Sequence, residues 1–287
     1  MGRYFDTRKA GYSWFDYKIP TEVAAIEAIR LLQPQDTQTV EEMQRWLLQE
    51  KRTQQWSTPI NAVNAVYAFM GDEMSEKLAP MNAQLSVLNV DGREIETSQA
   101  TAGLGYVKST QEGRNFKTFT AEKTSDGTSW GAIYIRSFQP VSEIADASSG
   151  LKVKREVFVI SRSSGVQEDS RSSLLDSPSS LKVGDRVKIR IIIEAERDYD
   201  FVQVSDKRAA CLEPVGQLSG YRWGYYCAPR DNVTNYYFDR MAKGSHIVET
   251  EYYVDRTGRY QTGTCTVQCA YSPEYTARTA AEWFEVK

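Results

Sequence analysis

The sequence predicts a multidomain protein of the α+β class, with helices first and antiparallel β-structure after them. Apolar residues recur at helical spacing through residues 1–80 and tend to alternate with polar residues from position 81 to the end. A chain of 287 residues also exceeds the usual size of one domain. Because the strands of residues 146–287 are regularly spaced, we expect this part to be a β-sandwich.

Three helices are predicted in the first 80 residues. The segment TEVAAIEAIRLLQ, which begins at Thr21, is apolar nearly all round, as in a helix buried among other helices. Thr39 and Glu42 form a capping box in front of a second helix, and Pro59 opens a third. The apolar positions of the second and third helices are Val40, Met43, Trp46, Leu47, Ile60, Val63, Tyr67 and Met70. Stripes this wide need more helical partners than the chain supplies, so we expect a fragment of a larger helical domain.

Strands are predicted after the helices. The dipeptide Asp91-Gly92 is a strong turn signal between two short strands, and WGAIYIRSF at 130–138 is typical of a further strand. A connector at 140–150 precedes the sandwich. Within the sandwich, residues 187–194 alternate so that one face of the strand should be buried and the other largely wet.

Charge and hydropathy argue against nucleic-acid binding and against a transmembrane segment. The chain has 35 basic and 38 acidic residues, and its net charge of −3 argues against nucleic-acid binding. It has no apolar run of about 18 residues, so no transmembrane segment is expected. The opening residues, MGRYFDTRKAGYSWF, lack the plan of a signal peptide. We therefore expect a cytosolic protein or, if it is exported, a piece of a longer chain.

No enzyme active site, metal site or cofactor is expected. His246 is the only histidine, and no nucleophile or carboxylate motif accompanies it. It shares strand parity with Val248, Tyr252 and Val254, which favours a structural or surface role. The cysteine spacing does not match ordinary zinc ligands. Metal-dependent and histidine-dependent catalysis are therefore disfavoured.

The four cysteines lie in the last third of the chain. The period of two places Cys265, Cys269 and Tyr271 on the same side of one strand, with the two cysteines about 13 Å apart. A disulfide requires Cα atoms within about 7 Å, so these two cannot bridge each other. Any bridge must reach Cys211 or Cys227, and we favour the pairs Cys211–Cys269 and Cys227–Cys265. Buried free thiols are the alternative.

Two aromatic clusters leave a choice between packing and binding. They are YRWGYY at 221–226 and NYYF at 235–238. Aromatic residues fill sandwich cores and domain interfaces, which is the interpretation we favour. The alternative is a carbohydrate-binding or adhesion module at the cell surface. Loss of glycan binding on replacement of Trp223 or Tyr225 by alanine would support that alternative.

Several motifs resemble the carboxyl-terminal end of bacterial α2-macroglobulin family proteins, especially those of the Bacteroidetes type. They are MQRWLLQEKRTQQWSTPINAVNAVYAF in the helices, then GLKVKREVFVI, LKVGDRVKIRIII, DYDFVQVSDKRAACLEP and FDRMAKGSHIVETEYYV. The resemblance implies that residues 1–80 end a thioester-bearing α/α-toroid and that 81–145 belong to a CUB-like domain. Residues 146–287 would be the macroglobulin-like MG10 sandwich.

The same resemblance implies a function. Family members of this type are large, non-enzymatic protease traps of the periplasm or cell envelope, and some carry a lipid anchor. The expected partners are therefore host or competitor proteases and the other domains of the same chain. Cys211-Leu212-Glu213-Pro214 only superficially resembles the thioester sequence C-G-E-Q. Any thioester would consequently lie upstream of residue 1.

The resemblance also indicates a contact site. In thioester-bearing relatives, a stretch M-Y-x-P-E of the terminal domain presses its tyrosine against the thioester and excludes water. Tyr271, Pro273 and Glu274 match that stretch, while Ala270 stands where the methionine would be. Because proline interrupts strand pairing, we expect Pro273 to end the strand and leave Tyr271 at a sheet end, covering a neighbouring domain.

Overall fold

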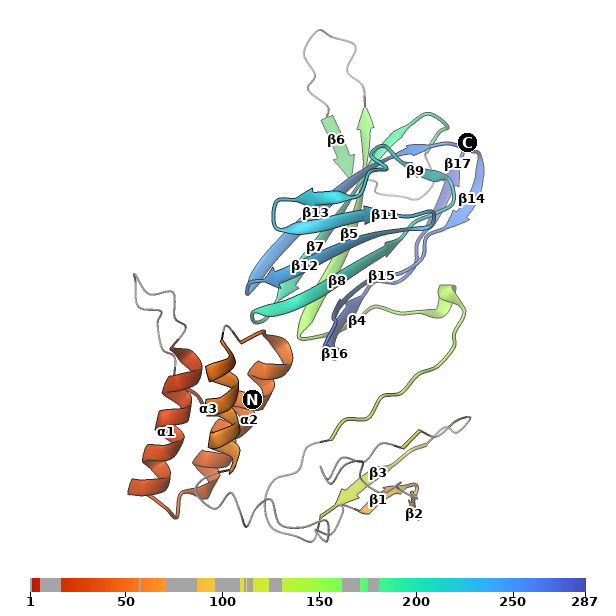
Figure 1. Cartoon of the computed structure of the whole chain (residues 1–287). Helices are drawn as coiled ribbons and strands as arrows, with labels where there is room; N and C mark the ends of the chain where they lie inside the picture. The colour runs from red at the N-terminus through yellow and green to blue at the C-terminus, as the bar shows by residue number, and fades with distance from the viewer. Residues whose placement is uncertain are drawn as a thin grey trace. The chain divides into compact units, whose positions relative to one another are not determined.

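The protein is described here by a computed structural model (Figure 1). The described residues are 2–5, 17–56, 58–70, 87–95, 109–110, 112, 116–123, 131–161, 171–174 and 181–287. The chain divides into two compact units. One comprises residues 1–47 and 56–135, and the other comprises residues 48–55 and 136–287.

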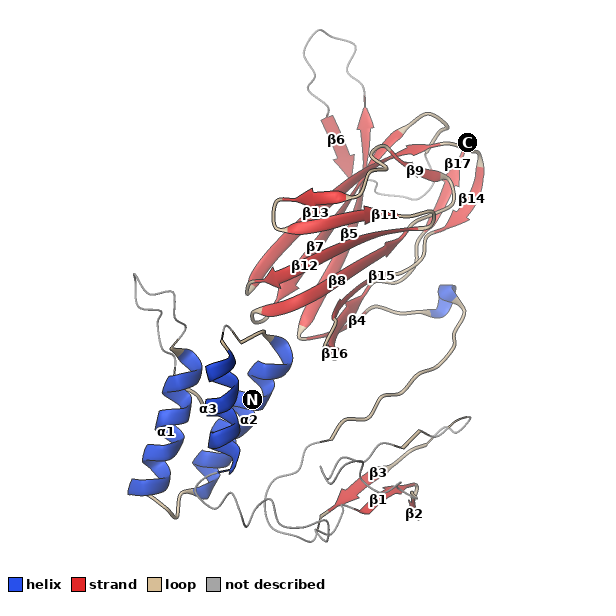
Figure 2. Cartoon of the chain, in the orientation of Figure 1, coloured by secondary structure: helices blue, strands red, loops and turns tan. Residues whose placement is uncertain are grey.

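The helices are α1 (Lys18–Leu32), α2 (Thr37–Thr53) and α3 (Pro59–Met70), shown in blue in Figure 2. Their shared core contains Ile26, Met43, Leu47 and Ala68, all of which are buried. No helix in the described part of the chain combines the length and apolarity needed to cross a membrane.

The start of α2 differs from the prediction. The helix begins at Thr37, and the carboxylate of Asp36 accepts a hydrogen bond from the backbone N–H of Thr39 at 3.2 Å. Asp36 is therefore the capping residue, and Thr39 lies inside the first turn. Both residue types are good N-caps, and the aspartate reaches the free N–H groups one turn earlier. Hydrogen bonds from the Thr39 side chain and from its backbone N–H hold the pKa of Asp36 below its ordinary value.

The apolar stripe predicted for α3 is not buried. Ile60, Val63 and Tyr67 are exposed, whereas Ala65 and Ala68 face the helical core. By contrast, the predicted stripe of α2 is buried. The two alanines allow close packing of α3, so its larger apolar residues point away from the helices that the structure describes.

A three-stranded antiparallel sheet has the order β2-β1-β3, with β1 at Val87–Val90, β2 at Arg93–Glu94 and β3 at Phe119–Glu122. Asp91 and Gly92 form the two-residue turn between β1 and β2, with φ of 47° and 75°. This confirms the turn prediction. The strand expected at 130–138 is wrong for residues 131–138, which form no strand. An alternating pattern needs a partner strand, and this segment has none among the described residues.

The second unit is a sandwich of a seven-stranded and a five-stranded antiparallel sheet, with orders β10-β11-β12-β8-β15-β16-β4 and β6-β5-β7-β13-β9. A two-stranded pair, β14-β17, accompanies them. The strands are β4 (Ala147–Ser149), β5 (Leu151–Ser161), β6 (Arg171–Leu174), β7 (Arg186–Ala195), β8 (Tyr199–Lys207), β9 (Leu212–Pro214), β10 (Gly220–Arg222), β11 (Tyr225–Pro229), β12 (Val233–Met241), β13 (Gly244–Val254), β14 (Gly258–Gln261), β15 (Cys265–Cys269), β16 (Ser272–Arg278) and β17 (Trp283–Val286). A short 3-10 helix, η2 (Val141–Glu143), precedes β4.

The two sheets enclose one hydrophobic core. Ile189 and Val248 from the five-stranded sheet meet Val204 and Val267 from the seven-stranded sheet, and all four are buried. Along β7 the residues at 187, 189, 191 and 193 are buried, as the alternation predicts. The α+β class and the β-sandwich are therefore confirmed. The domain boundaries at 80 and 145 stay predictions, because much of the chain around 80 lies outside the described residues.

Candidate functional site

The predicted contact site is the turn between β15 and β16. Cys269 pairs with Ser272, so Ala270 and Tyr271 form a two-residue turn. Cys265 and Cys269 are both buried, but Tyr271, which the period of two placed on the same side of the strand, is 72% exposed. The alternation stops because β15 ends at Cys269, and the turn rotates the tyrosine outward. Tyr271 is thus presented to solvent at the end of the sheet.

Phe201 on β8 is the neighbour of this turn that sequence reasoning missed. Its carbonyl accepts a hydrogen bond from the backbone N–H of Ala270 at 2.9 Å. Its ring meets the Tyr271 ring edge to face, with centroids 5.3 Å apart and an interplanar angle of 86°. Phe201 therefore supports the tyrosine through both its backbone and its side chain.

The backbone of Phe201 is unusual, with a φ of 57°. A bulky residue rarely occupies this left-handed region, and doing so costs roughly 1–2 kcal/mol. The conformation lets Tyr199 and Val202, three residues apart, both face the core. That odd spacing of buried residues is the sequence signal that could have revealed the kink. Such strain persists where the surrounding structure determines it, and it often marks a functional site.

Polar contacts anchor the other side of the turn. Ser272 is buried, and its hydroxyl donates to the carbonyl of Arg52 at 2.6 Å. Glu274 pairs with the Arg52 guanidinium at 2.7 Å. Residues 48–55, which carry Arg52, belong to the same compact unit as the sandwich. Ser272 and Glu274 are therefore occupied in holding the turn, and Tyr271 is the residue left available for a further contact.

Pro273 was predicted to end the strand, which is wrong, but it does interrupt the hydrogen-bonded ladder. β16 begins at Ser272 and runs through the proline. Pairing with β15 shifts register between Gln268 and Cys269, with Gln268 opposite Thr276. The proline carbonyl accepts a hydrogen bond from the Gln268 side chain at 3.3 Å. A proline lacks an N–H for the ladder, and the irregularity accommodates this at the turn.

The disulfide pairings favoured from the sequence are wrong, because all four cysteines are free and buried. Strand order explains one error: Cys227 on β11 and Cys265 on β15 are separated by β12 and β8. Three interstrand steps span about 14 Å, twice the reach of a disulfide. Cys211 and Cys269 lie toward opposite ends of β8, since Cys269 pairs with Val202 and Cys211 follows the strand end.

The four thiols are also expected to be unreactive near neutral pH. Burial raises the pKa of each of them, that of Cys211 to about 11 and that of Cys265 well above its ordinary value. A thiol of raised pKa stays protonated near neutral pH, and only the thiolate is a good nucleophile or metal ligand. The cysteines therefore serve as core residues.

The contacts of His246 are those of a structural residue. Its ring is partly buried, Nε2 lies 2.6 Å from the carbonyl of Ala242, and Phe238 contacts it edge to face. Val248, Tyr252 and Val254 on the same strand are buried, in agreement with the predicted parity. The described residues place no nucleophile or carboxylate in hydrogen-bond contact with the ring.

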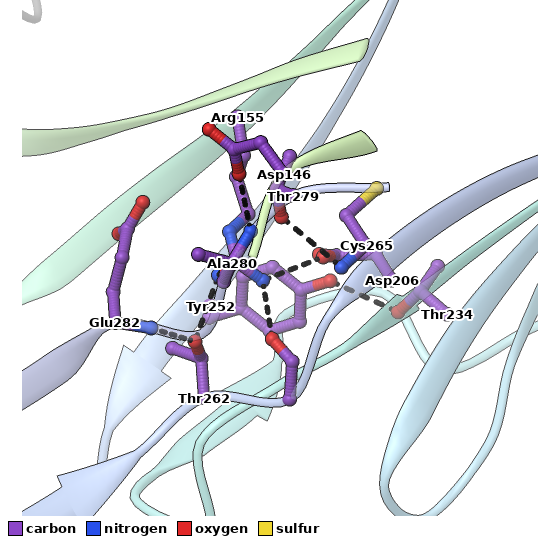
Figure 3. A network of polar contacts seen from close by, with 11 residues as sticks. Asp146, Arg155, Asp206, Thr234, Tyr252, Thr262, Cys265, Thr279, Ala280 and Glu282 are labelled. Carbon is purple, nitrogen blue, oxygen red and sulfur yellow. Dashed lines mark hydrogen bonds and ion pairs between the residues drawn. The ribbon is translucent and has the colours of Figure 1, made fainter. Parts of the chain in front are cut away.

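A buried polar network joins the two sheets of the sandwich (Figure 3). Arg155 on β5 donates to Asp206 on β8 at 3.1 Å and to the carbonyl of Gly263 at 3.0 Å. Its second terminal nitrogen donates to the Thr262 hydroxyl at 2.7 Å and to the carbonyl of Ala280 at 3.4 Å. The guanidinium thus binds four groups from three segments of the chain, around residues 206, 262–263 and 280.

Further hydrogen bonds surround this ion pair. The hydroxyls of Tyr252 and Thr234 lie 2.9 Å apart, and the backbone of Cys265 donates to the Thr279 hydroxyl at 3.2 Å (Figure 3). Burial raises the pKa of Asp206, and the charge of Arg155 opposes that rise. Because both charged side chains are buried, substrate has no access to them, and the network acts as a tie between the sheets.

The aromatic clusters divide between core and surface. Tyr225 packs inward against Phe238 and Tyr236, so it cannot test glycan binding as proposed from the sequence. Trp223, at the turn between β10 and β11, is fully exposed, and Tyr221 is 79% exposed. The first cluster therefore supplies both a core residue and surface residues.

One comparison with known proteins matches a family model to part of the chain. The family model of the bacterial alpha-2-macroglobulin MG10 domain matches residues 150–274. A comparison with curated proteins finds no match.

Similar solved structures include two of the alpha-2-macroglobulin of Escherichia coli and one of that of Salmonella. The native Escherichia coli protein is 20% identical over 52% of this chain and 10% of its own, with a TM-score of 0.42. The trypsin-activated E. coli protein is 14% identical over 95% and 19%, with a TM-score of 0.48. The Salmonella protein reacted with methylamine is 16% identical over 98% and 18%, with a TM-score of 0.42. This chain thus spans less than a fifth of each of these three structures.

Proposed function

Because the chain belongs to the bacterial alpha-2-macroglobulin family through the MG10 domain of residues 150–274, we propose that it is the carboxyl-terminal part of a larger protease trap. In this proposal the chain has no catalytic role, and its sandwich packs against other domains of its parent. Residues 1–80 are the end of an α/α-toroid, 81–145 belong to a CUB-like domain, and 146–287 form MG10. The family match is the observation that carries the proposal.

The proposed site of action is the β15–β16 turn. Tyr271 is largely exposed, whereas Ser272 and Glu274 are held by Arg52. An aromatic ring fixed at a sheet end covers apolar surface at little cost in side-chain entropy. We infer that Tyr271 covers a neighbouring domain of the parent and shields a thioester there from water, with Ala270 leaving room beside it.

Phe201 acts in this proposal as a positioning residue. Its edge-to-face contact limits the directions in which the Tyr271 ring can point. The left-handed backbone of Phe201 directs the Phe201 ring toward the turn. The tyrosine is therefore held ready before it meets the neighbouring domain.

Protease trapping is tested with the full-length parent. Incubation with an endoprotease should leave the protease active on a small peptide substrate but inactive on a large protein substrate. Trapping sterically blocks large substrates, so the two activities separate. Equal inhibition of both substrates, or of neither, contradicts the trapping function while leaving the fold assignment intact.

The role of Tyr271 is tested by the rate of thioester loss in the same parent, followed as the appearance of a titratable thiol. Tyr271→Ala should speed this loss at least about tenfold, since water then reaches the bond. Tyr253→Ala is the matched control, because Tyr253 is an exposed tyrosine on the other sheet. Equal rates in the two variants, or no thioester in the parent, would contradict the shielding role.

The proposed location is the periplasm or cell envelope, with the parent exported and held there by a lipid anchor. The expected partners are host or competitor proteases, and a Bacteroidetes-type parent is the proposed source. Cell fractionation with an antibody against residues 150–274 tests the location. Recovery of the parent in the cytosolic fraction would contradict it.

A further inference from the structure

A row of aromatic and amide side chains crosses the seven-stranded sheet. Backbone register places Tyr221 opposite Tyr226, Tyr226 opposite Tyr237, Tyr237 opposite Gln203, and Gln203 opposite Gln268. These five residues, which we call the tyrosine–glutamine row, are direct cross-strand neighbours on β10, β11, β12, β8 and β15. Four interstrand steps give the row a length of about 19 Å.

The row lies on the outer face of the sandwich. The residues next to it along the strands form the adjacent inward row, and they are buried: Cys227, Tyr236, Val204 and Val267. Successive side chains of a strand point to opposite faces, so the tyrosine–glutamine row faces away from the core. Tyr221 is 79% and Tyr237 40% exposed.

The side chains of the row are already ordered. Tyr226 contacts Tyr221 and Tyr237 with ring centroids 5.0 and 6.5 Å away. Gln203 donates to the Ser205 hydroxyl at 3.1 Å, and Gln268 donates to the Pro273 carbonyl at 3.3 Å. A ligand would therefore meet groups whose conformational entropy is largely lost before binding, which favours affinity.

The chemistry of the row selects one class of ligand. All five side chains are uncharged, so the row lacks the cations that nucleic acids and anionic lipids require. None is aliphatic, which disfavours insertion into a lipid bilayer. Aromatic rings beside amides combine an apolar stacking surface with hydrogen-bonding groups. Sugars present the matching pair of features, an apolar C–H face and a rim of hydroxyls.

We propose that the tyrosine–glutamine row binds a neutral linear polysaccharide that lies across the strands. The sugar rings stack on the tyrosines, and their hydroxyls hydrogen-bond to the amides of Gln203 and Gln268. Trp223, two residues after Tyr221 in the β10–β11 turn, adds a fully exposed aromatic ring. This activity is independent of the protease trap and would attach the protein to a glycan layer.

The test uses the chain of residues 1–287 and a panel of linear hexasaccharides of glucose, mannose, xylose and N-acetylglucosamine. Binding is followed by calorimetry and by the NMR signals of the glutamine side-chain amides. At least one hexasaccharide should bind and shift the signals of Gln203 and Gln268. Tyr221→Ala and Tyr237→Ala should each weaken that binding at least about tenfold, because each removes a stacking ring.

Two controls separate stacking from folding. Tyr237→Phe keeps the ring and should bind within about threefold of the parent chain, since the stacking face is retained. Tyr253→Ala removes a tyrosine that is 41% exposed, matching Tyr237, but lies on the five-stranded sheet. It should leave binding unchanged. The proposal is overturned if no hexasaccharide binds, or if Tyr253→Ala weakens binding as much as Tyr221→Ala.

Discussion

Two arginine–carboxylate pairs in the sandwich unit have different environments. Arg155 and Asp206 lie 3.1 Å apart between the sheets, with side chains only 1% and 0% exposed. Arg52 and Glu274 lie 2.7 Å apart at the β15–β16 turn, with side chains 41% and 35% exposed. The shorter pair is expected to contribute less to stability, because water screens it and solvates either partner when the other is lost. Burial and the surrounding hydrogen bonds, rather than distance, decide what the loss of a partner costs.

The largest effect is expected when one partner of the buried pair is removed. Asp206→Ala should lower the free energy of unfolding by about 3–5 kcal/mol, because it leaves the Arg155 guanidinium buried without its counter-charge. Urea unfolding followed by tryptophan fluorescence measures this loss. The double variant Arg155→Met with Asp206→Leu should recover most of it. A loss below about 1 kcal/mol for the single variant would remove the distinction between the two pairs.

A buried carboxylate in the helical unit extends the comparison through its pH dependence. Glu22 on α1 is buried, it accepts a hydrogen bond from the backbone N–H of Phe5, and its Oε2 has no hydrogen-bond partner. Burial raises its pKa to about 7 from an ordinary value of 4.5. The folded state therefore holds a proton that the unfolded state releases. The stability that comes from keeping Glu22 protonated is fully present below about pH 4.5 and is lost as the pH rises through about 7. The free energy of unfolding should fall by up to about 3 kcal/mol over this range.

Glu22→Gln tests this dependence. The glutamine stays neutral, so the helical unit of the variant should keep its stability between pH 5 and pH 8 while that of the parent chain falls. Urea unfolding followed by circular dichroism at several pH values compares the two. Parallel curves for the two proteins would show that Glu22 is ionised in the folded state.

The left-handed backbone of Phe201 is expected to have a smaller effect. Alanine in a strand is ordinarily more stable than glycine by about 0.5–1 kcal/mol. At position 201 the order should reverse, with Phe201→Gly about 1 kcal/mol more stable than Phe201→Ala, because only glycine adopts this φ without strain. Chemical denaturation of the two variants measures the difference. The ordinary order at this position would mean that the backbone strain is absent in solution.

The smallest effect is expected at the exposed pair. Arg52→Ala should cost about 0.5 kcal/mol at low salt and less at high salt, where exposed charges are screened. Denaturation in dilute buffer and in concentrated sodium chloride tests both parts of the prediction. A loss as large as that of Asp206→Ala would show that the turn is as tightly coupled to the fold as the interior.

Much of the fold follows from local patterns. The alternation in β7 and β13 locates their buried residues because one face of each strand meets the core. The Asp91-Gly92 turn follows from its dipeptide, since few residues accept positive φ at two successive positions. The N-cap of α2 was predicted at Thr39 but lies at Asp36, because both residue types are good N-caps and the two positions lie within one turn.

Long-range features could not be predicted in the same way. The cysteine pairing failed because it depends on which strands are neighbours, and β12 and β8 lie between Cys227 and Cys265. The partnership of Arg155 with Asp206 also depends on how the two sheets face each other. In the candidate site, Tyr271 was identified by resemblance, but its outward direction depends on where β15 ends. Its neighbour Phe201 was identified from its contacts with Ala270 and Tyr271, which depend on the pairing of β8 with β15.

The ends of the two sheets carry a further consequence. The outermost strands β4, β6, β9 and β10 have only three or four residues each, whereas the central β7, β8, β12 and β13 have nine to eleven. An edge this short exposes few unpaired backbone groups on which another chain could add a strand. The short outer strands themselves therefore offer little backbone for edge-to-edge pairing, which is one of the ways in which β-sheet proteins limit aggregation.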